Sequence, residues 1–429
     1  MTKWLATTRQ KILLAICDHN IAVMTIRGKA DMSTTLQMLD QGSLRHILEA
    51  HNLYKLRKPG GRVANLSYID LTDFKLEGVD LSDANLTGAR LYGASLRDAN
   101  FMRANLYGCD LRNADLRFAR LDRADLRGAC LRGANLTAAS LTGADLREGM
   151  IAFKDEKQGL RLMNHEKRPG ELDHAIFSGA DLSGARMNGM QAVSADFSDA
   201  NLSGAIMSHA KLRKANLSGA NLTGADLMGA DVTGADMTGA VMVNTTTSGC
   251  NLREADTTGM LDAPKEVFID ERPLKDFVAL HEDWAKTGGA KGSRQTLSGV
   301  DFRLAGDMRK RVLTMLEADG AILFGLDLSG IELQGANLVN ADLRRCNLSG
   351  ADLRGARLIG AKLNHADLTG ANIGPLDLGG GRLMRSDLSR AVLSHANLSN
   401  ADLTRARMLE AVTEHLTDKG CNYMLTERA

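Results

Sequence analysis

Large apolar residues recur at every fifth position over most of the chain, in three runs that cover residues 66–151, 177–257 and 323–408. A small residue, usually Ala, stands two positions before each large one. Asp or Asn lies between the two, and Ser, Thr or Arg followed by Gly comes after them. The repeating unit is A-[DN]-L-[STR]-G, and it predicts one buried Leu and one buried Ala in every repeat.

A period of five fits neither regular element. On a helix, five residues turn the chain by about 500°, so the leucines would reach every face. On a strand, an odd period sends alternate leucines to opposite faces. The period makes sense if the chain bends once per unit, and Gly, Asn, Asp and Ser tolerate such bends. The sequence therefore predicts a solenoid.

Stretches such as ANLTA at 134–138 and ANLTG at 220–224 resemble the pentapeptide-repeat proteins. The resemblance implies a right-handed quadrilateral β-helix in which four repeat units make one coil. Residues four units apart would then stack at about the 4.8 Å spacing of neighbouring strands. The expected fold class is a β-solenoid, built as two rods with α-helical caps and insertions.

Two stretches outside the repeat predict helices. The first begins with Ser43 as its N-cap and continues to about residue 56, and the second is opened by Pro273 and closed by glycines 288–289. Before the first helix, residues 21–26 have the composition of a strand. Each helix is followed directly by the repeat, so we expect it to cover the open end of a rod, where bare strand edges would otherwise invite aggregation.

The two predicted helices align with each other, His51 with His281 and Tyr54 with Trp284. This alignment indicates two copies of one unit, a capping helix followed by a solenoid. We interpret all four residues as structural parts of the caps. Each His is expected to bond to the backbone, because no second metal ligand is suitably spaced.

Three segments interrupt or end the repeat. Residues 152–172 are rich in Lys, Glu and Arg and shift the register by one, which favours a charged loop bulging from a continuous rod; a hinge between rods is the alternative. Residues 307–319 and 409–418 have helical spacing. The expected organisation is an N-terminal region with a capping helix (1–62), a first solenoid (63–262) with the charged loop, a linker and capping helix (263–295), a second solenoid (296–411) with a helical insertion (305–320), and a C-terminal cap or tail (412–429).

Composition narrows the class of protein. The 53 Lys and Arg nearly balance the 52 Asp and Glu, which excludes a uniformly basic nucleic-acid binder. The six cysteines form no CxxC pair, so reduced thiols in the cytoplasm are expected. The apolar run at 12–17 is too short for a secretory signal or a membrane span. Secretion by a non-classical route stays open.

Catalytic motifs such as GxxxxGK[ST], HExxH and GxSxG are missing from the sequence, and most carboxylates occupy turn positions. Three cysteines replace Ala at inward positions and are interpreted as small core residues: Cys109, Cys250 and Cys346. Three histidines are expected to point outward, none of them four repeat units from another, so no stacked metal pair is expected: His209, His365 and His395. We therefore expect neither enzymatic activity nor a cofactor nor a metal.

Arginines of the first run form pairs four repeat units apart, which a four-unit coil would stack: Arg97 with Arg117, Arg103 with Arg123, Arg112 with Arg132, and Arg127 with Arg147. Stacked like charges repel unless side chains splay, a carboxylate intervenes or an anionic partner binds. One interpretation is a solvated rim of mixed charge. The other is a surface for an acidic protein face or a phosphate-bearing partner.

The first functional hypothesis is a non-enzymatic scaffold or adaptor with a protein partner and no direct nucleic-acid binding. The resemblance offers a second, because some pentapeptide-repeat proteins mimic DNA and bind type II topoisomerases such as gyrase. Residues 173–262, with 10 acidic and 5 basic residues, are the stretch suited to that role. A third is a secreted bacterial effector or secretion-system component. Tyr423, Met424 and Leu425 leave a homodimer through the C-terminal tail open.

Overall fold

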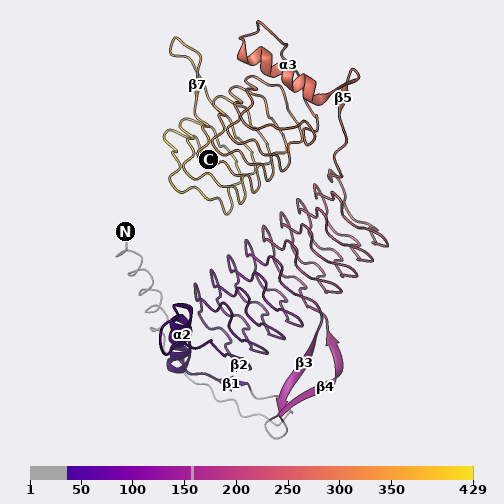
Figure 1. Ribbon diagram of the computed structural model, residues 1–429, viewed down its shortest axis with the longest axis vertical. Helices are drawn as coiled ribbons and strands as arrows, with labels where there is room; N and C mark the ends of the chain where they lie inside the picture. The colour runs from indigo at the N-terminus through magenta and orange to yellow at the C-terminus, as the bar shows by residue number, and fades with distance from the viewer. Residues whose placement is uncertain (1–35, 156–158, 429) are drawn as a thin grey trace. The chain divides into compact units, whose positions relative to one another are not determined.

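The computed structural model describes residues 36–155 and 159–428, and the strand expected over residues 21–26 lies outside them. The chain divides into two compact units, Met1–Ala263 and Pro264–Ala429. In each unit a helix precedes a long stack of bends (Figure 1). The two units have separate buried cores, each formed from residues of its own unit.

Single-residue parallel β-bridges join successive coils. Asn85 pairs with Asn105 and Arg90 with Asp110, each partner four repeat units further along the chain. The amide of Leu86 donates to the carbonyl of Asn105 (2.7 Å), and the amide of Asn105 donates back to the carbonyl of Ala84 (2.9 Å). The backbone therefore closes a hydrogen-bonded ladder between coils, although few bridges are long enough to count as strands.

The side chains that point into the solenoid are the Leu and Ala residues that the period of five predicts. Leu86, Leu106 and Leu126 are each 0% exposed, one in each of three successive coils. The turn that follows each leucine needs a left-handed backbone. At Gly88 the φ angle is +65°, and a Cβ atom there would come within 2.6 Å of the Tyr68 ring. Glycine therefore adopts this turn without backbone strain and leaves room for the Tyr68 ring.

Residues 149–168 form a β-hairpin, so most of the charged loop that was expected to bulge from a continuous rod over 152–172 consists of two paired strands. Strand β3 (Gly149–Asp155) pairs antiparallel with β4 (Gly159–Arg168), as the magenta arrows in Figure 1 show. Cys130 pairs with Glu171, and Asn135 with Ile176, so each partner lies beyond the hairpin instead of four repeat units further on. The β-bridges therefore skip the hairpin in sequence, and the coils before and after it are hydrogen-bonded directly to each other.

Helix α2 (Gln41–Lys55) packs on the first coil of the first unit. Its N-cap is Asp40, whose side chain accepts the amide hydrogen of Ser43 at 2.9 Å, so the expected cap at Ser43 is wrong. Leu44 and His51 of this helix are buried. Before the helix, β1 (Gln37–Met38) pairs in parallel with β2 (Ile69–Asp70) of the first coil.

Helix α3 (Leu274–Lys286) has the corresponding place in the second unit. It follows a short hairpin of β5 (Phe268–Ile269) and β6 (Arg272–Pro273), and Pro273 is its N-cap residue. The helix buries Leu274, Phe277 and Val278 in the core of the second solenoid. Both predicted helices are thus present, within a few residues of their expected bounds.

The helical insertion expected over residues 305–320 is wrong, because this segment belongs to the solenoid. Val312 pairs with Glu332 and Glu317 with Asn337, in the ordinary four-unit register. The large and small inward residues exchange places here, with Leu316 two positions before Ala318 and both buried. That exchange hides the period of five and produces a spacing that resembles a helix.

The amphipathic helix expected over residues 409–418 is also wrong. The bridges Val392 with Val412 and Asn397 with Thr417 continue the ladder, which reaches Glu427. The second solenoid therefore includes most of the segment 412–429 that was assigned to a cap or tail. The inward positions of this coil hold exposed Thr413 and Asp418, so the apolar period fades although the fold continues.

A second hairpin lengthens one coil of the second solenoid. Strands β7 (Leu376–Asp377) and β8 (Leu383–Met384) are joined by a turn with three consecutive glycines. Across this insertion, Arg357 pairs with Asp387, which lies six repeat units further on instead of four. In the coils on either side of this hairpin, the side chains that stack on each other are therefore six repeat units apart in sequence.

Candidate functional site

The structure stacks each predicted arginine pair in adjacent coils, but it separates the four pairs. Each arginine pair lies two or three residues after the bridge residues of a different row of β-bridges. The four pairs therefore lie on four different parts of the coil circumference. The rows are those that contain Ser95 and Asp115, Asn100 and Arg120, Asp110 and Cys130, and Asp125 and Asp145. The eight arginines therefore do not make one surface.

Seven of the eight arginines are in ion pairs. Four form two-point contacts with the Asp two positions earlier, as Arg112 does with Asp110 at 2.8 and 2.6 Å. The other three of these are Arg117 with Asp115, Arg127 with Asp125, and Arg147 with Asp145. The remaining pairs are Arg103 with Asp83, Arg97 with Asp98, and Arg132 with Glu171. These carboxylates offset the repulsion expected between stacked arginines.

One of these carboxylates, Asp83, contacts two cations. Arg103 and Lys55 together lower the pKa of Asp83 to about 2. The Nε of Arg103 lies 2.6 Å from Asp83, and the Nζ of Lys55 lies 2.8 Å from it. Because Lys55 is the last residue of α2, this carboxylate also ties the capping helix to the solenoid.

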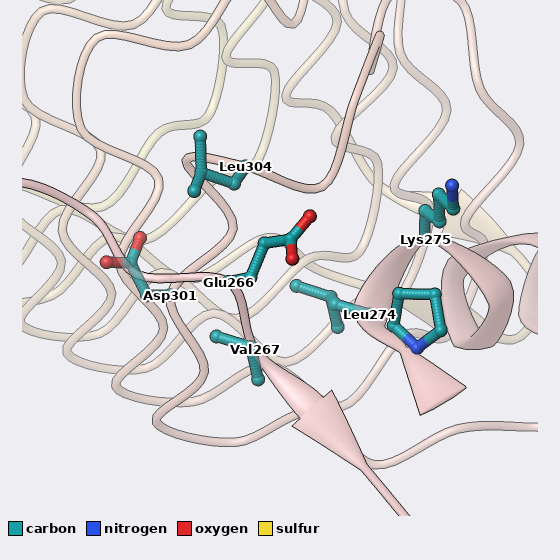
Figure 2. Close-up of a pocket in the computed structure, with 7 residues that line it drawn as sticks. Glu266, Val267, Leu274, Lys275, Asp301 and Leu304 are labelled. Carbon is teal, nitrogen blue, oxygen red and sulfur yellow. The ribbon is translucent and has the colours of Figure 1, made fainter. Parts of the chain in front are cut away.

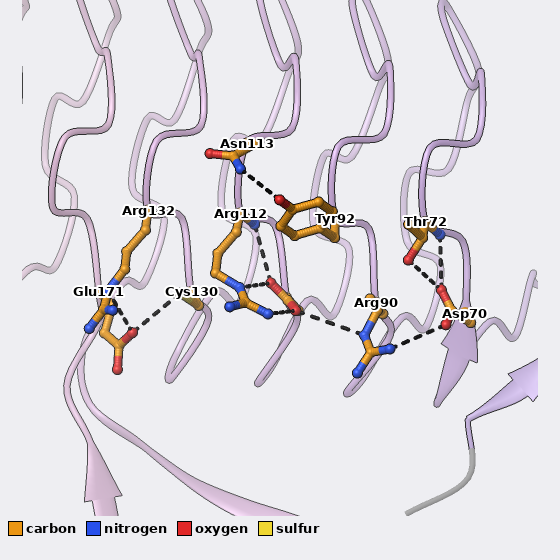
Figure 3. A network of polar contacts seen from close by, with 10 residues as sticks. Asp70, Thr72, Arg90, Tyr92, Arg112, Asn113, Cys130, Arg132 and Glu171 are labelled. Carbon is orange, nitrogen blue, oxygen red and sulfur yellow. Dashed lines mark hydrogen bonds and ion pairs between the residues drawn. The ribbon is translucent and has the colours of Figure 1, made fainter. Parts of the chain in front are cut away.

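One side of the first solenoid carries several polar contacts that join neighbouring coils (Figure 3). Arg90 lies between Asp70 (3.4 Å) and Asp110 (3.9 Å), so opposite charges alternate from coil to coil. In the neighbouring column, the guanidinium of Arg112 lies 5.5 Å from the centre of the Tyr92 ring. We call this side, defined by Arg90, Tyr92, Arg112, Asn113 and Arg132, the tyrosine flank.

The hydroxyl of Tyr92 is hydrogen-bonded, in addition to the contact that its ring makes with Arg112. Asn113 donates a hydrogen bond from Nδ2 to the Tyr92 hydroxyl at 3.1 Å. The ring remains 37% exposed, and the side chains of Arg112 and Arg132 are 47% and 53% exposed. The tyrosine flank therefore presents fixed aromatic and guanidinium groups to solvent.

Sequence reasoning missed these aromatic contacts. Two further arginines lie over rings, Arg127 at 5.4 Å from Tyr107 and Arg97 at 5.1 Å from Phe118. The available signal was the four-unit register itself, because Tyr92 and Tyr107 each stand one coil before an arginine. A ring and a guanidinium stacked in this way attract each other.

The four residues assigned to the caps all lie at the junctions between helix and solenoid. The Nδ1 atoms of His51 and His281 accept the amide hydrogens of Ala64 and Gln295, each at 3.0 Å. The protonated Nε2 of His281 then donates to the carbonyl of Thr314 (3.1 Å). Burial is the main reason that the pKa values of both imidazoles are lowered.

The two cap histidines also contact aromatic rings. Tyr54 stacks on His51 with ring centres 6.0 Å apart, and Trp284 lies 5.4 Å from His281 at an angle of 46°. Both histidines are hydrogen-bonded and fully buried, and their lowered pKa values favour the neutral ring, so they serve the junction and are shielded from solvent.

Outward histidines stack in the second solenoid, a contact that the search for a stacked metal pair did not predict. His365 and His395 lie 4.8 Å apart between ring centres and are nearly parallel, and His415 lies 4.9 Å from His395. The sequence reasoning looked for a separation of four repeat units, whereas the β7–β8 hairpin makes the separation six. His209 occupies the same kind of turn in the first solenoid, with Gly229 in the next coil.

The described residues contain no group of three or more His, Cys, Asp and Glu side chains arranged to hold a metal. A shallow hollow beside the start of α3 is lined by Glu266, Val267, Pro273, Leu274, Lys275, Asp301 and Leu304 (Figure 2). Burial raises the pKa of the inward thiols Cys109 and Cys346 to about 12, so neither is a ready nucleophile.

The family model for pentapeptide repeats matches the chain in eight copies, which together cover more than half of it: residues 64–101, 99–137, 119–148, 195–234, 205–242, 321–358, 336–373 and 377–411. The comparison with curated proteins finds no match. Among the described residues, no helix has the length and apolar character required to cross a bilayer.

Solved structures of repeat proteins are also similar to parts of the chain. The pentapeptide repeat protein Rfr23 from the cyanobacterium Cyanothece 51142 is 28% identical, over 30% of this chain and 84% of that one, with a TM-score of 0.22. A protein from the thylakoid lumen of Arabidopsis thaliana is 27% identical over 24% and 83%, with a TM-score of 0.18. QnrB1, a plasmid-mediated fluoroquinolone resistance protein, is 20% identical over 45% and 83%, with a TM-score of 0.22.

Proposed function

Because the chain belongs to the pentapeptide-repeat family, we propose that it is a non-enzymatic scaffold or adaptor whose solenoids bind a protein partner. In this proposal both solenoids are right-handed quadrilateral β-helices capped by α2 and α3. The buried Leu and Ala rows maintain the fold, so the outward rows are free to specialise in recognition. The cytoplasm is the proposed compartment, since the five described cysteines are free thiols.

The tyrosine flank is the proposed contact surface, and the observation that carries it is the fixed pairing of Tyr92 with Arg112 and Asn113. Tyr and Arg are enriched among the residues that dominate protein interfaces. Their fixed positions here reduce the conformational entropy lost on binding. Carboxylates already neutralise Arg112 and Arg132, which favours a mixed polar protein surface over the phosphates of a nucleic acid.

The test is a pair of double variants in a capture experiment from native lysate, read by mass spectrometry. Tyr92→Ala with Arg132→Ala removes exposed groups of the tyrosine flank, and we expect it to abolish capture of the partner. Arg117→Ala with Arg147→Ala is the matched control, since it removes two arginines of other columns that are also partly exposed. Equal capture by both variants would exclude the tyrosine flank as the contact surface.

A gyrase-binding DNA mimic is the second candidate, favoured by the acidic stretch 173–262. Asp196, Asp236 and Asp256 belong to one column of β-bridges, so their carboxylates repeat along the solenoid. A supercoiling assay tests this role. We expect the chain to inhibit or protect gyrase, and replacement of the three aspartates by Asn to remove the effect; no effect of the unmodified chain would end this candidate.

Self-association through the last coil is also proposed. Met424 and Leu425 are 61% and 64% exposed, whereas Tyr423 is engaged within the chain by Arg428, 3.4 Å from its ring centre. Burying such apolar side chains favours association. Light scattering of the unmodified chain and of Met424→Ser with Leu425→Ser measures it; a mass that the substitutions leave unchanged would contradict the proposal.

A further inference from the structure

Three histidines from successive coils of the second solenoid form a single stack, which we call the histidine column: His365, His395 and His415. The amide of His365 donates to the carbonyl of Ser394, and that of His395 to the carbonyl of Glu414, so the backbone fixes the order of the coils. All three occupy the left-handed turn position, with φ angles between +56° and +61°. Their side chains therefore leave the coil in the same direction.

The surroundings of the column are poor in negative charge. Arg345 occupies the same turn position one coil before His365, since its amide donates to the carbonyl of Asn364. Arg344 is committed to Asp342 at 2.6 Å, and exposed Lys362 adds another cation nearby. Glu414, next to the exposed His415, is the acidic residue at the outer end of the column.

We propose that the histidine column is an acid-sensitive element that holds the last coils of the second solenoid together at neutral pH and loosens them on acidification. Neutral rings stack favourably at a spacing of 4.8–4.9 Å. Protonated rings at the same spacing repel one another, and Arg345 repels them as well. The middle ring, His395, has a histidine on each side, so protonation of either neighbour opposes its own protonation.

The direction of the effect follows from the titration of His395. Burial, His415 and Arg345 lower the pKa of His395 to about 4. An unfolded histidine has a pKa of about 6.5, so the unfolded chain binds this proton first. The contribution to stability is therefore complete above about pH 6.5 and declines as the pH falls towards 4.

The present stack is suited to protons rather than to a shared metal ion. A ring nitrogen binds zinc in the plane of its own ring at about 2.0–2.1 Å, and the stacked, nearly parallel planes of His365 and His395 have no such position in common. The described residues contain no metal-holding group. The experiment nevertheless includes a chelator, so that adventitious metal cannot produce the pH dependence.

The first test compares His395→Asn with His209→Asn in the full chain, by thermal unfolding between pH 7.5 and 5 in the presence of EDTA. Asn suits this turn, since Asn340 and Asn400 adopt it with φ angles of +55° and +58°. We expect the acid-induced fall in the unfolding temperature to shrink by at least half in His395→Asn. His209→Asn should behave as the unmodified chain, because the next coil places Gly229 beside His209. An unchanged fall in His395→Asn would overturn the proposal.

The second test needs no destabilising variant. Titration of the histidine ring signals by NMR in the unmodified chain should give His395 a midpoint well below 6.5. His415→Asn should raise that midpoint, because it removes one of the repelling neighbours. A His395 that titrates near 6.5 would contradict the proposal. His281 also becomes acid-sensitive through burial, but it is present in every chain compared, so the differences report on the column.

Discussion

A single buried imidazole joins each capping helix to its solenoid, and the two joints differ in strength. His281 accepts from Gln295 and donates to Thr314, so His281→Ala leaves both backbone groups without their partner. We expect a loss of about 1–3 kcal/mol in the free energy of unfolding. Urea unfolding at pH 7.5 measures it. Because burial lowers the pKa of His281, the contribution is present above about pH 6.5 and declines below it.

His51 is the natural comparison for that prediction. Its Nδ1 accepts from Ala64, whereas its Nε2 has no hydrogen-bond partner among the described residues. His51→Ala should therefore cost less than His281→Ala, by about the 1 kcal/mol of one hydrogen bond. A larger loss for His51→Ala would show that packing, and not hydrogen bonding, determines the strength of the cap.

Among the elements, the β7–β8 hairpin depends on a glycine of the coil beneath it. A Cβ atom at Gly355 would lie 2.9 Å from the Cβ of Leu376 and 3.3 Å from the carbonyl oxygen of Met384. Gly355→Ala should therefore displace the hairpin and cost about 1–3 kcal/mol beyond the backbone strain. Hydrogen exchange of the amides in residues 376–384 measures the displacement, and urea unfolding measures the loss.

Gly350 separates the packing effect from the backbone effect. Its φ angle of +64° is close to the +67° of Gly355, but a Cβ atom there would have nothing within 4 Å. Gly350→Ala should therefore incur only the left-handed strain, about 1–2 kcal/mol. It should also leave exchange in the hairpin unchanged. Faster exchange there in Gly350→Ala would mean that the contact with Gly355 is not what holds the hairpin.

Elements were predictable wherever Leu and Ala kept their order. Leu316 and Ala318 stand in the reverse order, which gives their segment a helix-like spacing although β-bridges make it part of the solenoid. Near the C-terminus, exposed Thr413 and Asp418 occupy inward positions, so the sequence there does not show the repeat. The period of five can be recognised in the sequence only where the inward side chains are apolar and the small residue always precedes the large one. The backbone ladder has no such requirement, because it uses main-chain groups.

At the scale of the whole molecule, side-chain columns were predictable only where the register is uniform. The four-unit separation correctly stacked Arg112 under Arg132, but it did not show that the four arginine pairs lie in four columns or that carboxylates neutralise them. The histidine column was not predicted for two reasons. The hairpin between His365 and His395 lengthens one coil from four repeat units to six, and His415 fell in a segment that was expected to be a helix. Sites on a solenoid thus depend on the insertions as much as on the repeat.

The separate cores lead to a prediction about unfolding. Leu106 belongs to the core of the first unit and Leu348 to that of the second; both are 0% exposed. Each Leu→Ala substitution should cost about 2–5 kcal/mol through lost burial and the cavity that remains. Since the described parts of the two cores share no residue, we expect two calorimetric transitions. Leu106→Ala should lower one and Leu348→Ala the other. If either substitution lowered both transitions equally, the two units would unfold as a single cooperative structure despite their separate cores.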